Sequence, residues 1–314
     1  TDGVDGEHLT DRLTNEAINF IKNHKNKPFY MNLWYFSVHN PLQAKMELVE
    51  KYKQKIDPRG RQGFPVMGAM IETLDQNIGR LMTALEKMKM MNNTILVFTS
   101  DNGGVEYESY NGKTPTDNHP LRDGKGNVHE GGIRVPCIVR WPGQTQAGSV
   151  SNQVISGIDF FPTLLDMVGV DKSAVKNNID GLSLTQVLKS DKQLQRKGVY
   201  IDFPHYAVYP ASYPSTLLIN DQWKLIRFYG EAPHGGDFYE LYKINEDIEE
   251  NFNVAAYYPG VVKDLDAQLS KHIKEVGHHE PIRNPSYNPK AVNLIGKKRQ
   301  NLRANHSIEN TLIK

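Results

Sequence analysis

The sequence predicts an α/β fold, in which a mostly parallel sheet flanked by helices precedes a small antiparallel sheet with one helix. Two apolar runs, Phe29–Phe36 and Thr94–Ser100, are rich in the aromatic and β-branched residues of strands covered on both faces. Between them, apolar residues recur every three or four positions from about Phe64 to Met91, which predicts a long helix. A helix between two such strands indicates a βαβ unit with parallel strands.

The remaining elements follow the same patterns along the chain. An amphipathic helix begins near Thr10, and "GIDFFPTLLDMVG" and "SLTQVLKS" predict two more helices. The run "IRVPCIVRWPG" predicts a further strand. The short runs "KGVYIDF", "PSTLLIN", "QWKLIRFY" and "FYELYKI" are separated by turn residues and predict the antiparallel sheet. A last helix extends from Pro259 to about Val276.

These elements divide the 314 residues into three parts, because the chain is too long for one minimal domain. Residues 1–191 form the α/β domain, and residues 192–280 form a small subdomain of antiparallel strands and a helix. Residues 281–314 are polar and basic, and we expect a poorly ordered tail there.

Charge and cysteine content exclude several classes of protein. The chain has 37 basic and 36 acidic residues, so its net charge of +1 gives no reason to expect a nucleic acid or a membrane as partner. No apolar run approaches the length of a membrane span. The single cysteine, Cys137, excludes an internal disulfide, and its apolar neighbours predict that it is buried.

The stretch "FTSDNGG" (98–104) ends a predicted strand in an acid, an amide and two glycines. Ligands of open α/β sheets gather at the carboxyl ends of strands, and the oxygens of Asp101 and Asn102 suit calcium or magnesium. Gly103 and Gly104 allow a close approach of the backbone or a positive φ. A plain turn explains these four residues equally well, and calcium needs six to eight oxygens.

The stretch "PLRDGKGNVHEGGIRVPCIVRWPG" (120–143) resembles a signature region of the type I, formylglycine-dependent sulfatases. In that family a Ser-Asp-Asn-Gly strand end is followed by Leu-Arg-x-x-Lys-Gly and then by Glu-Gly-Gly-x-Arg-Val-Pro. The stretch "SVHNPLQAK" resembles the family's His-x-Pro-Leu element. The motifs "FPHY" and "QWKLIRFY" are similar to the subdomain of arylsulfatase A-like enzymes. The resemblance extends to about Pro289 and corresponds to the C-terminal two-thirds of such enzymes.

The resemblance implies an alkaline-phosphatase-like fold and assigns roles to individual residues. Asp101 and Asn102 match two ligands of a calcium ion that binds the sulfate, with magnesium as the weaker candidate. Lys125 matches a lysine that contacts a sulfate oxygen. His39 matches a histidine that hydrogen-bonds the sulfate or protonates the departing alcohol. These residue types suit sulfuryl transfer, which shifts negative charge onto the leaving oxygen.

Plainer roles remain open for several of these residues. Lys125 can be an exposed loop lysine, and His39 can cap a local carbonyl. His205 is a candidate for binding substrate, with a structural role as the equal alternative. We expect His129 to be structural, and Arg122 and Glu130 to form a supporting ion pair.

Two parts of the family's active site are absent from the sequence. The formylglycine nucleophile is made from Cys or Ser in Cys/Ser-x-Pro-Ser-Arg, and no such motif occurs. "SYPST" (212–216) lacks the final Arg and follows the metal strand, whereas the family's nucleophile precedes it. The family's Asp-Asp strand is missing as well. We therefore expect Thr1 to lie partway into a longer protein, and this chain alone to be inactive.

Three functions remain as hypotheses. The first is a sulfatase that acts on a small-molecule or carbohydrate sulfate ester, with formylglycine in the missing segment. The second is a phosphodiesterase or phosphonate monoester hydrolase of the same superfamily, although its two-zinc members place His where Asn102 stands. The third is a non-catalytic scaffold. The resemblance implies a periplasmic or secreted protein, although no signal peptide precedes the first helix.

Overall fold

The computed structural model describes residues 6–61, 63–107, 114–171, 173, 175–190, 192–206, 212–232, 236–278, 281–282 and 285–286. The chain forms two compact units. Unit 1 comprises Thr1–Val97, Glu108–Asp117 and Ile138–Gly143, and unit 2 comprises Phe98–Tyr107, Asn118–Cys137 and Gln144–Lys314. The predicted tail lies almost entirely outside the described residues, and the boundary at residue 191 stays a prediction.

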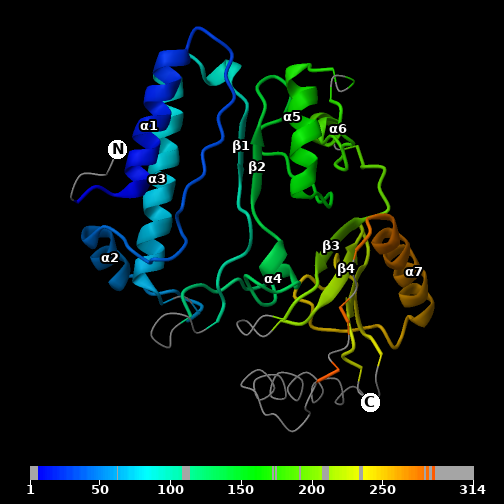
Figure 1. Cartoon of the computed structure of the whole chain (residues 1–314). Helices are drawn as coiled ribbons and strands as arrows, with labels where there is room; N and C mark the ends of the chain where they lie inside the picture. Colours follow the sequence, from blue (N-terminus) through cyan, green and yellow to red (C-terminus); the bar gives the residue numbers. More distant parts are fainter. Residues whose placement is uncertain are drawn as a thin grey trace. The chain divides into compact units, whose positions relative to one another are not determined.

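Unit 1 is built around the predicted long helix, α3 (Pro65–Lys87). The first helix, α1 (Leu9–His24), packs along it, and the short α2 (Met46–Lys53), which the sequence analysis missed, packs at its other end (Figure 1). Thr10 does not cap α1 but lies inside it, and its hydroxyl is 2.6 Å from that of Ser37. Only Val49 of α2 is buried, so the helix has no clear apolar face by which the sequence could have predicted it.

The predicted buried strand at Phe29–Phe36 is wrong, because this segment is extended but pairs with no strand among the described residues. Its side chains alternate between half-buried and exposed, and the exposed set includes Tyr30, Trp34 and Phe36. The strand at residues 94–100 is confirmed as β1 (Leu96–Thr99), which pairs with β2 (Cys137–Arg140). No residue of either strand is buried, and Cys137 is exposed, so their predicted burial is also wrong.

Unit 2 contains the predicted antiparallel sheet. Its strands are β3 (Val199–Phe203), β4 (Ser215–Ile219), β5 (Lys224–Phe228) and β6 (Phe238–Tyr242), paired in the order β3-β4-β5-β6. Leu217 lies opposite Ile201 on β3 and Ile226 on β5. The remaining described helices are the 3₁₀ helix η1 (Met91–Asn93) of unit 1 and, in unit 2, α4 (Glu130–Ile133), the 3₁₀ helix η2 (Gly157–Asp159), α5 (Phe160–Val168), α6 (Thr185–Ser190) and α7 (Pro259–Glu275).

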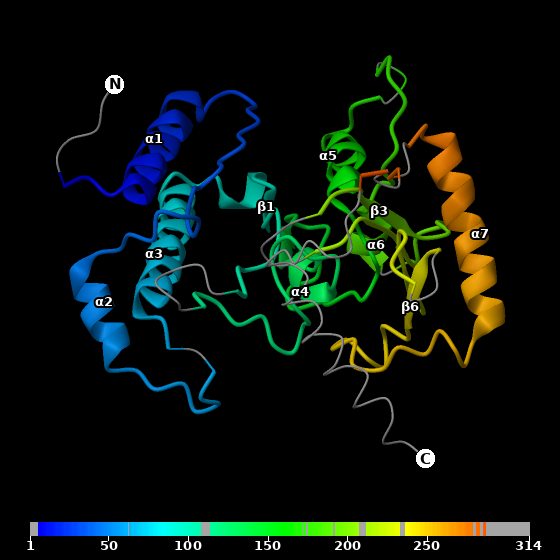
Figure 2. The same ribbon diagram turned by 60° about the horizontal axis from the view of Figure 1, so that its bottom comes forward.

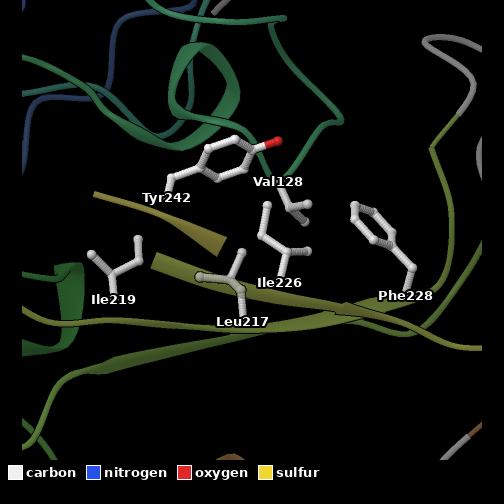
Figure 3. Packing of buried hydrophobic residues seen from close by; sticks show 6 residues of the cluster. All are labelled: Val128, Leu217, Ile219, Ile226, Phe228 and Tyr242. Carbon is white, nitrogen blue, oxygen red and sulfur yellow. The ribbon is translucent and has the colours of Figure 1, made fainter. Parts of the chain in front are cut away.

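Both faces of this sheet are covered, which explains why all five residues of β4 are buried. Leu218, Leu225 and Leu241 face α7, which packs along the sheet in both views (Figure 1, Figure 2). Residues of the opposite face surround Val128, a residue of the loop that precedes α4 (Figure 3). The sheet therefore anchors the loop that contains Lys125.

The predicted mostly parallel sheet is not present in the described part of the chain, which contains the two-stranded β1–β2 sheet and the four-stranded antiparallel sheet. A segment becomes part of a parallel sheet only when its backbone forms hydrogen bonds with a neighbouring strand. The extended Phe29–Phe36 segment has no such neighbouring strand among the described residues. Local sequence patterns identify strand-forming segments but do not supply their pairing partners.

Candidate active site

The turn after β1 presents the two predicted metal ligands. The Oδ1 atom of Asp101 accepts a hydrogen bond from the backbone N–H of Asn102 at 3.0 Å. The Nδ2 group of Asn102 donates to the carbonyl of Gly103 at 2.9 Å. These bonds are typical of a turn, but they leave Asp101 Oδ2 and Asn102 Oδ1 without a hydrogen bond among the described residues.

The loop that contains Lys125 crosses directly over this turn. The backbone N–H of Lys125 donates to the carbonyl of Gly104 at 2.8 Å, and that of Gly103 donates to the carbonyl of Gly132 at 3.0 Å. Residues 101–104 and 125–132 are thus joined by backbone hydrogen bonds at two points. The structure brings the backbone of Lys125 next to the turn that contains Asp101 and Asn102.

Glycine at position 103 is required by packing rather than by conformation. A Cβ on Gly103 would lie 1.7 Å from the carbonyl oxygen of Gly131, and one on Gly124 would lie 2.3 Å from that of Gly104. Neither Gly103 nor Gly104 has a positive φ, so that part of the expectation is wrong. Real Cβ atoms essentially never come this close, so the two segments interlock only because side chains are absent.

Two residues fix the Lys125 loop to the sheet. Val128 is 4% exposed and packs against Leu217, Ile226 and Tyr242. Ser212 belongs to the "SYPST" stretch (212–216), which does not match the nucleophile motif. It is buried, and its hydroxyl donates a hydrogen bond to the carbonyl of Gly126. Ser212 therefore supports the residue after Lys125, a role that sequence reasoning missed.

A buried ion cluster lies where α4 meets the sheet. Lys224 of β5 is fully buried, and its Nζ lies 3.0 Å from Glu130 Oε1 and 2.7 Å from Glu250 Oε1. The second oxygen of Glu250 accepts the backbone N–H of Glu130 at 2.7 Å. Burial raises the pKa of Glu130, but the charges of Lys224 and Arg134 outweigh it, so the pKa is lowered and Glu130 is ionised.

The predicted ion pair between Arg122 and Glu130 is wrong, because each residue pairs elsewhere. Arg122 donates to the hydroxyl of Tyr242 at 2.8 Å and lies 3.7 Å from Glu240. The Tyr242 hydroxyl in turn donates to Glu240 at 2.8 Å. Glu130 instead binds Arg134 and Lys224. The spacing of Arg122 and Glu130 in sequence gave no signal for the partners of Arg122, which are more than 100 positions away, or for Lys224, which is 94 positions from Glu130.

His129 is buried between two carboxylates, as expected of a structural residue. Its Nδ1 lies 2.6 Å from Asp123 and its Nε2 lies 3.0 Å from Glu240. Burial and the charge of Arg122 lower the pKa of His129, but the nearby carboxylates, including Glu250, outweigh them and raise it to about 9. Burial raises the pKa of Glu240, yet its contacts with His129 and Arg122 lower it to about 2.

The structure shows the local surroundings of the two other predicted residues, His39 and His205. His39 is exposed in unit 1, and its Nδ1 lies 3.1 Å from the carbonyl of Asn40. His205 is exposed in unit 2, and its ring lies 3.9 Å from that of Phe203. In the described part of the chain, no hydrogen bond or ion pair links His205 to Asp101 or Lys125. Their functional roles stay predictions.

The side-chain oxygens at the turn are of the kind that binds calcium, but they are fewer than a calcium ion needs. A carboxylate and an amide oxygen are hard ligands with free lone pairs, and Asp101 forms no ion pair with any described residue. Within residues 6–286, so far as they are described, no group of three or more His, Cys, Asp or Glu could hold a metal ion. The same residues contain no helix long and apolar enough to span a bilayer.

Comparisons with known families agree with the motifs around this crossing. The Sulfatase family matches residues 2–170, more than half of the chain. The family described as N-sulphoglucosamine sulphohydrolase, C-terminal, matches residues 119–278, which include the Lys125 loop and the sheet. The chain belongs to the sulfatase family.

Individual relatives support the same conclusion. A sulfatase of Formosa agariphila is 32% identical over 85% of this chain and 49% of its own length. An N-acetylgalactosamine-6-O-sulfatase of Bacteroides thetaiotaomicron is 29% identical over 84% of this chain and 50% of its own. The chain therefore spans about half the length of these curated relatives.

Solved structures show the fold. The crystal structure of Ps i-CgsB in complex with k-i-k-neocarrahexaose aligns with a TM-score of 0.73 at 25% identity, covering 100% of this chain and 63% of that chain. The phosphonate monoester hydrolase of Agrobacterium radiobacter aligns with a TM-score of 0.51 at 24% identity over 67% of this chain, a likeness of fold alone. The described elements are thus part of the alkaline-phosphatase-like fold of the sulfatases.

Proposed function

We propose that the protein is a sulfuric ester hydrolase and that this chain supplies the Asp101–Asn102 turn and the Lys125 loop of its active site. The observation that supports this function most directly is the hydrogen bond from the Lys125 N–H to the Gly104 carbonyl. It places the backbone of the predicted sulfate-binding lysine beside the predicted metal-binding turn. A scaffold would have no need to retain the side chains of Asp101, Asn102, Lys125 and His39 together.

Each residue of the chain has a distinct part in this proposal. Asp101 and Asn102 hold a calcium ion, which supplies positive charge beside the sulfate when bound. The ammonium group of Lys125 binds a sulfate oxygen and stabilises the negative charge that develops as the S–O bond breaks. The nucleophile and the remaining metal ligands come from residues outside this chain, so the chain alone is inactive.

His39 has the chemistry of a proton donor in the same reaction. Its Nδ1 faces the carbonyl of Asn40, so Nδ1 holds a proton and Nε2 remains to exchange one with the departing alcohol. This role is tested with the His39→Gln variant. The variant should hydrolyse sulfate esters of poor leaving groups, which need a proton, much more slowly, and esters of good leaving groups only slightly more slowly.

The substrate class we propose is a sulfated carbohydrate. The relatives include enzymes described as N-acetylgalactosamine-6-O-sulfatase and N-acetylglucosamine-6-O-sulfatase, both from Bacteroides thetaiotaomicron. On this chain, the exposed His205 and Tyr206 offer groups that hydrogen-bond or stack on a sugar ring. A carbohydrate substrate fits a secreted or periplasmic protein.

The first test is to read the coding DNA upstream of Thr1. An in-frame Cys/Ser-x-Pro-Ser-Arg would supply the nucleophile, and the protein expressed from the complete coding sequence should release sulfate from sulfated sugars. Lys125→Ala should lower kcat/KM by roughly 100- to 1,000-fold, the usual effect of losing one charge-stabilising group. Lys197→Ala, at an exposed lysine outside the proposed site, is the control and should have no effect.

Three results would contradict the proposal in different ways. Release of sulfate unaffected by Lys125→Ala would remove Lys125 from the site. Bound zinc in elemental analysis, with hydrolysis of phosphate or phosphonate esters, would favour the phosphonate hydrolase function. A complete protein that binds neither calcium nor sulfate would indicate a scaffold.

A further inference from the structure

The side chain of Asn118 lies at the crossing between the Asp101 turn and the Lys125 loop. Its Nδ2 group donates to the carbonyl of Gly104 and to that of Asp123, both at 3.0 Å. Its Oδ1 accepts the backbone N–H of Gly104 at 3.2 Å. Both N–H groups and the oxygen of the amide are therefore used, and all three bonds go to backbone atoms.

These bonds connect the two functional segments through a single residue. The carbonyl of Gly104 accepts a bond from Asn118 Nδ2 and another from the N–H of Lys125 at 2.8 Å. Gly104 follows Asn102 by two residues, and Asp123 precedes Lys125 by two. Asn118 is thus bonded to the backbone two residues from the metal-binding turn and two residues from the lysine.

The chain is tightly packed around the side chain of Asn118. A Cβ on Gly124 would lie 2.7 Å from Asn118 Nδ2 and 2.9 Å from the backbone nitrogen of Glu106. Asn118 is itself held, because its own N–H donates to the carboxylate of Glu106 at 3.1 Å. The amide is therefore fixed in place before any ligand binds.

We propose that Asn118 is a positioning residue, which sets the spacing between Asp101–Asn102 and Lys125 through its three side-chain hydrogen bonds. The proposal rests on the proposed function, since the spacing matters for catalysis only if these residues bind a sulfate ester. Its physical reason is that a displacement of about 1 Å in a catalytic group costs on the order of 100-fold in rate.

The test compares Asn118→Ala with a matched control, Asn253→Ala. Asn253 also makes three side-chain bonds to the backbone, accepting from the N–H groups of Leu241 and Ala255 and donating to the carbonyl of Tyr239. Both variants lose the same number of bonds, so both should melt at a lower temperature. In the protein expressed from the complete coding sequence, only Asn118→Ala should lower kcat, on the order of 100-fold.

A second readout needs no activity and uses the chain itself. Hydrogen exchange of the Gly104 and Lys125 amides should accelerate in Asn118→Ala but not in Asn253→Ala, because only the first change removes bonds at the crossing. If Asn118→Ala does not fold, Asn118→Asp replaces it. This variant keeps the size of the side chain and an oxygen facing the Gly104 N–H, but it lacks the donors to Gly104 and Asp123.

The outcomes separate this proposal from the proposed function. Equal kcat values and equal exchange rates for the two alanine variants would overturn the role of Asn118, even in an active sulfatase. Faster exchange at Gly104 and Lys125 in a complete protein that hydrolyses no sulfate ester would support the role of Asn118 and overturn the function.

Discussion

Lys224 places an ammonium group, with no exposure to solvent, between the carboxylates of Glu130 and Glu250. The two acids belong to segments 120 positions apart, α4 and the residues after β6. Such a cluster does not by itself add much stability, because burying charges costs about as much as their attraction returns. Its effect is on geometry, since α4 can pack on the sheet only where the three charges meet.

We predict that Lys224→Met strongly destabilises the protein, because two buried carboxylates then lose their cation. The free energy of unfolding should fall by roughly 3–5 kcal/mol, as measured by urea unfolding followed by circular dichroism. Lys271→Met is the matched control at an exposed site on α7, and it should change stability by less than about 0.5 kcal/mol. Equal effects of the two changes would contradict the prediction.

We also predict that His129 makes stability depend on pH. Its pKa is raised from 6.5 to about 9 in the folded protein, so the stabilisation is complete below pH 6.5 and is lost as the pH rises through 9. At pH 7, His129→Gln should lower the free energy of unfolding by on the order of 2 kcal/mol. The difference between the wild-type and variant curves should shrink by pH 10, and a difference independent of pH would refute a charged His129.

Among the elements, the loop before α4 contributes one buried apolar side chain, Val128, to the core of unit 2. Val128 reaches the face of the sheet opposite α7, where six buried residues meet (Figure 3). The loop that contains Lys125 is otherwise polar. Its position relative to the sheet therefore depends on Val128, on Ser212 and on the ion cluster.

Val128→Ala should lower the free energy of unfolding by roughly 1–2 kcal/mol, because it leaves a cavity of two methyl groups in a packed core. The same substitution at Val150, which is 85% exposed, is the control and should have no measurable effect. Thermal unfolding of both variants checks the prediction. A Val128→Ala protein as stable as the control would show that the loop is held without it.

The extended Phe29–Phe36 segment exposes aromatic side chains to solvent. Trp34 and Phe36 are 78% and 70% exposed, far more than is usual for such large apolar residues. We predict that this chain, expressed by itself, self-associates through these residues. Replacing both with Ser should reduce light scattering at the same concentration, whereas replacing the exposed Val276 of unit 2 should not. Unchanged scattering in the double variant would locate the association elsewhere.

The sequence predicted those elements whose signal is local. The spacing of Met67, Met70, Leu74 and their neighbours predicted α3, and short runs separated by turn residues predicted the four strands of unit 2. Burial of Phe29–Phe36, β1 and Cys137 was predicted wrongly, because burial depends on partners that a run of apolar residues does not identify. At the site, the motifs located Lys125, but no pattern announced Asn118 or Lys224, whose roles depend on distant contacts.

At the scale of the whole molecule, the chain holds two predicted metal ligands and spans about half of its curated relatives. We predict that this chain by itself binds calcium no more tightly than about 1 mM, since two ligands are far fewer than the six to eight that calcium takes. Isothermal titration calorimetry with calcium measures this affinity. The Asp101→Ala variant shows how much of the measured heat comes from calcium binding at the turn. A micromolar affinity abolished by Asp101→Ala would mean that the chain contains further ligands.

The hydrogen bond between Glu130 and Glu250 joins residues 120 positions apart, and this separation has a consequence for synthesis. A ribosome adds about 5–20 residues per second, so Glu250 is made roughly 6–24 s after Glu130. For most of that interval the newly made loop lacks the complete sheet, whose last strand ends at Tyr242, and its acidic and basic groups are exposed to water. Lys125 therefore reaches its final place late in translation, and a chain that stops before the sheet is complete should lack the contacts of Val128 that help to fix its loop.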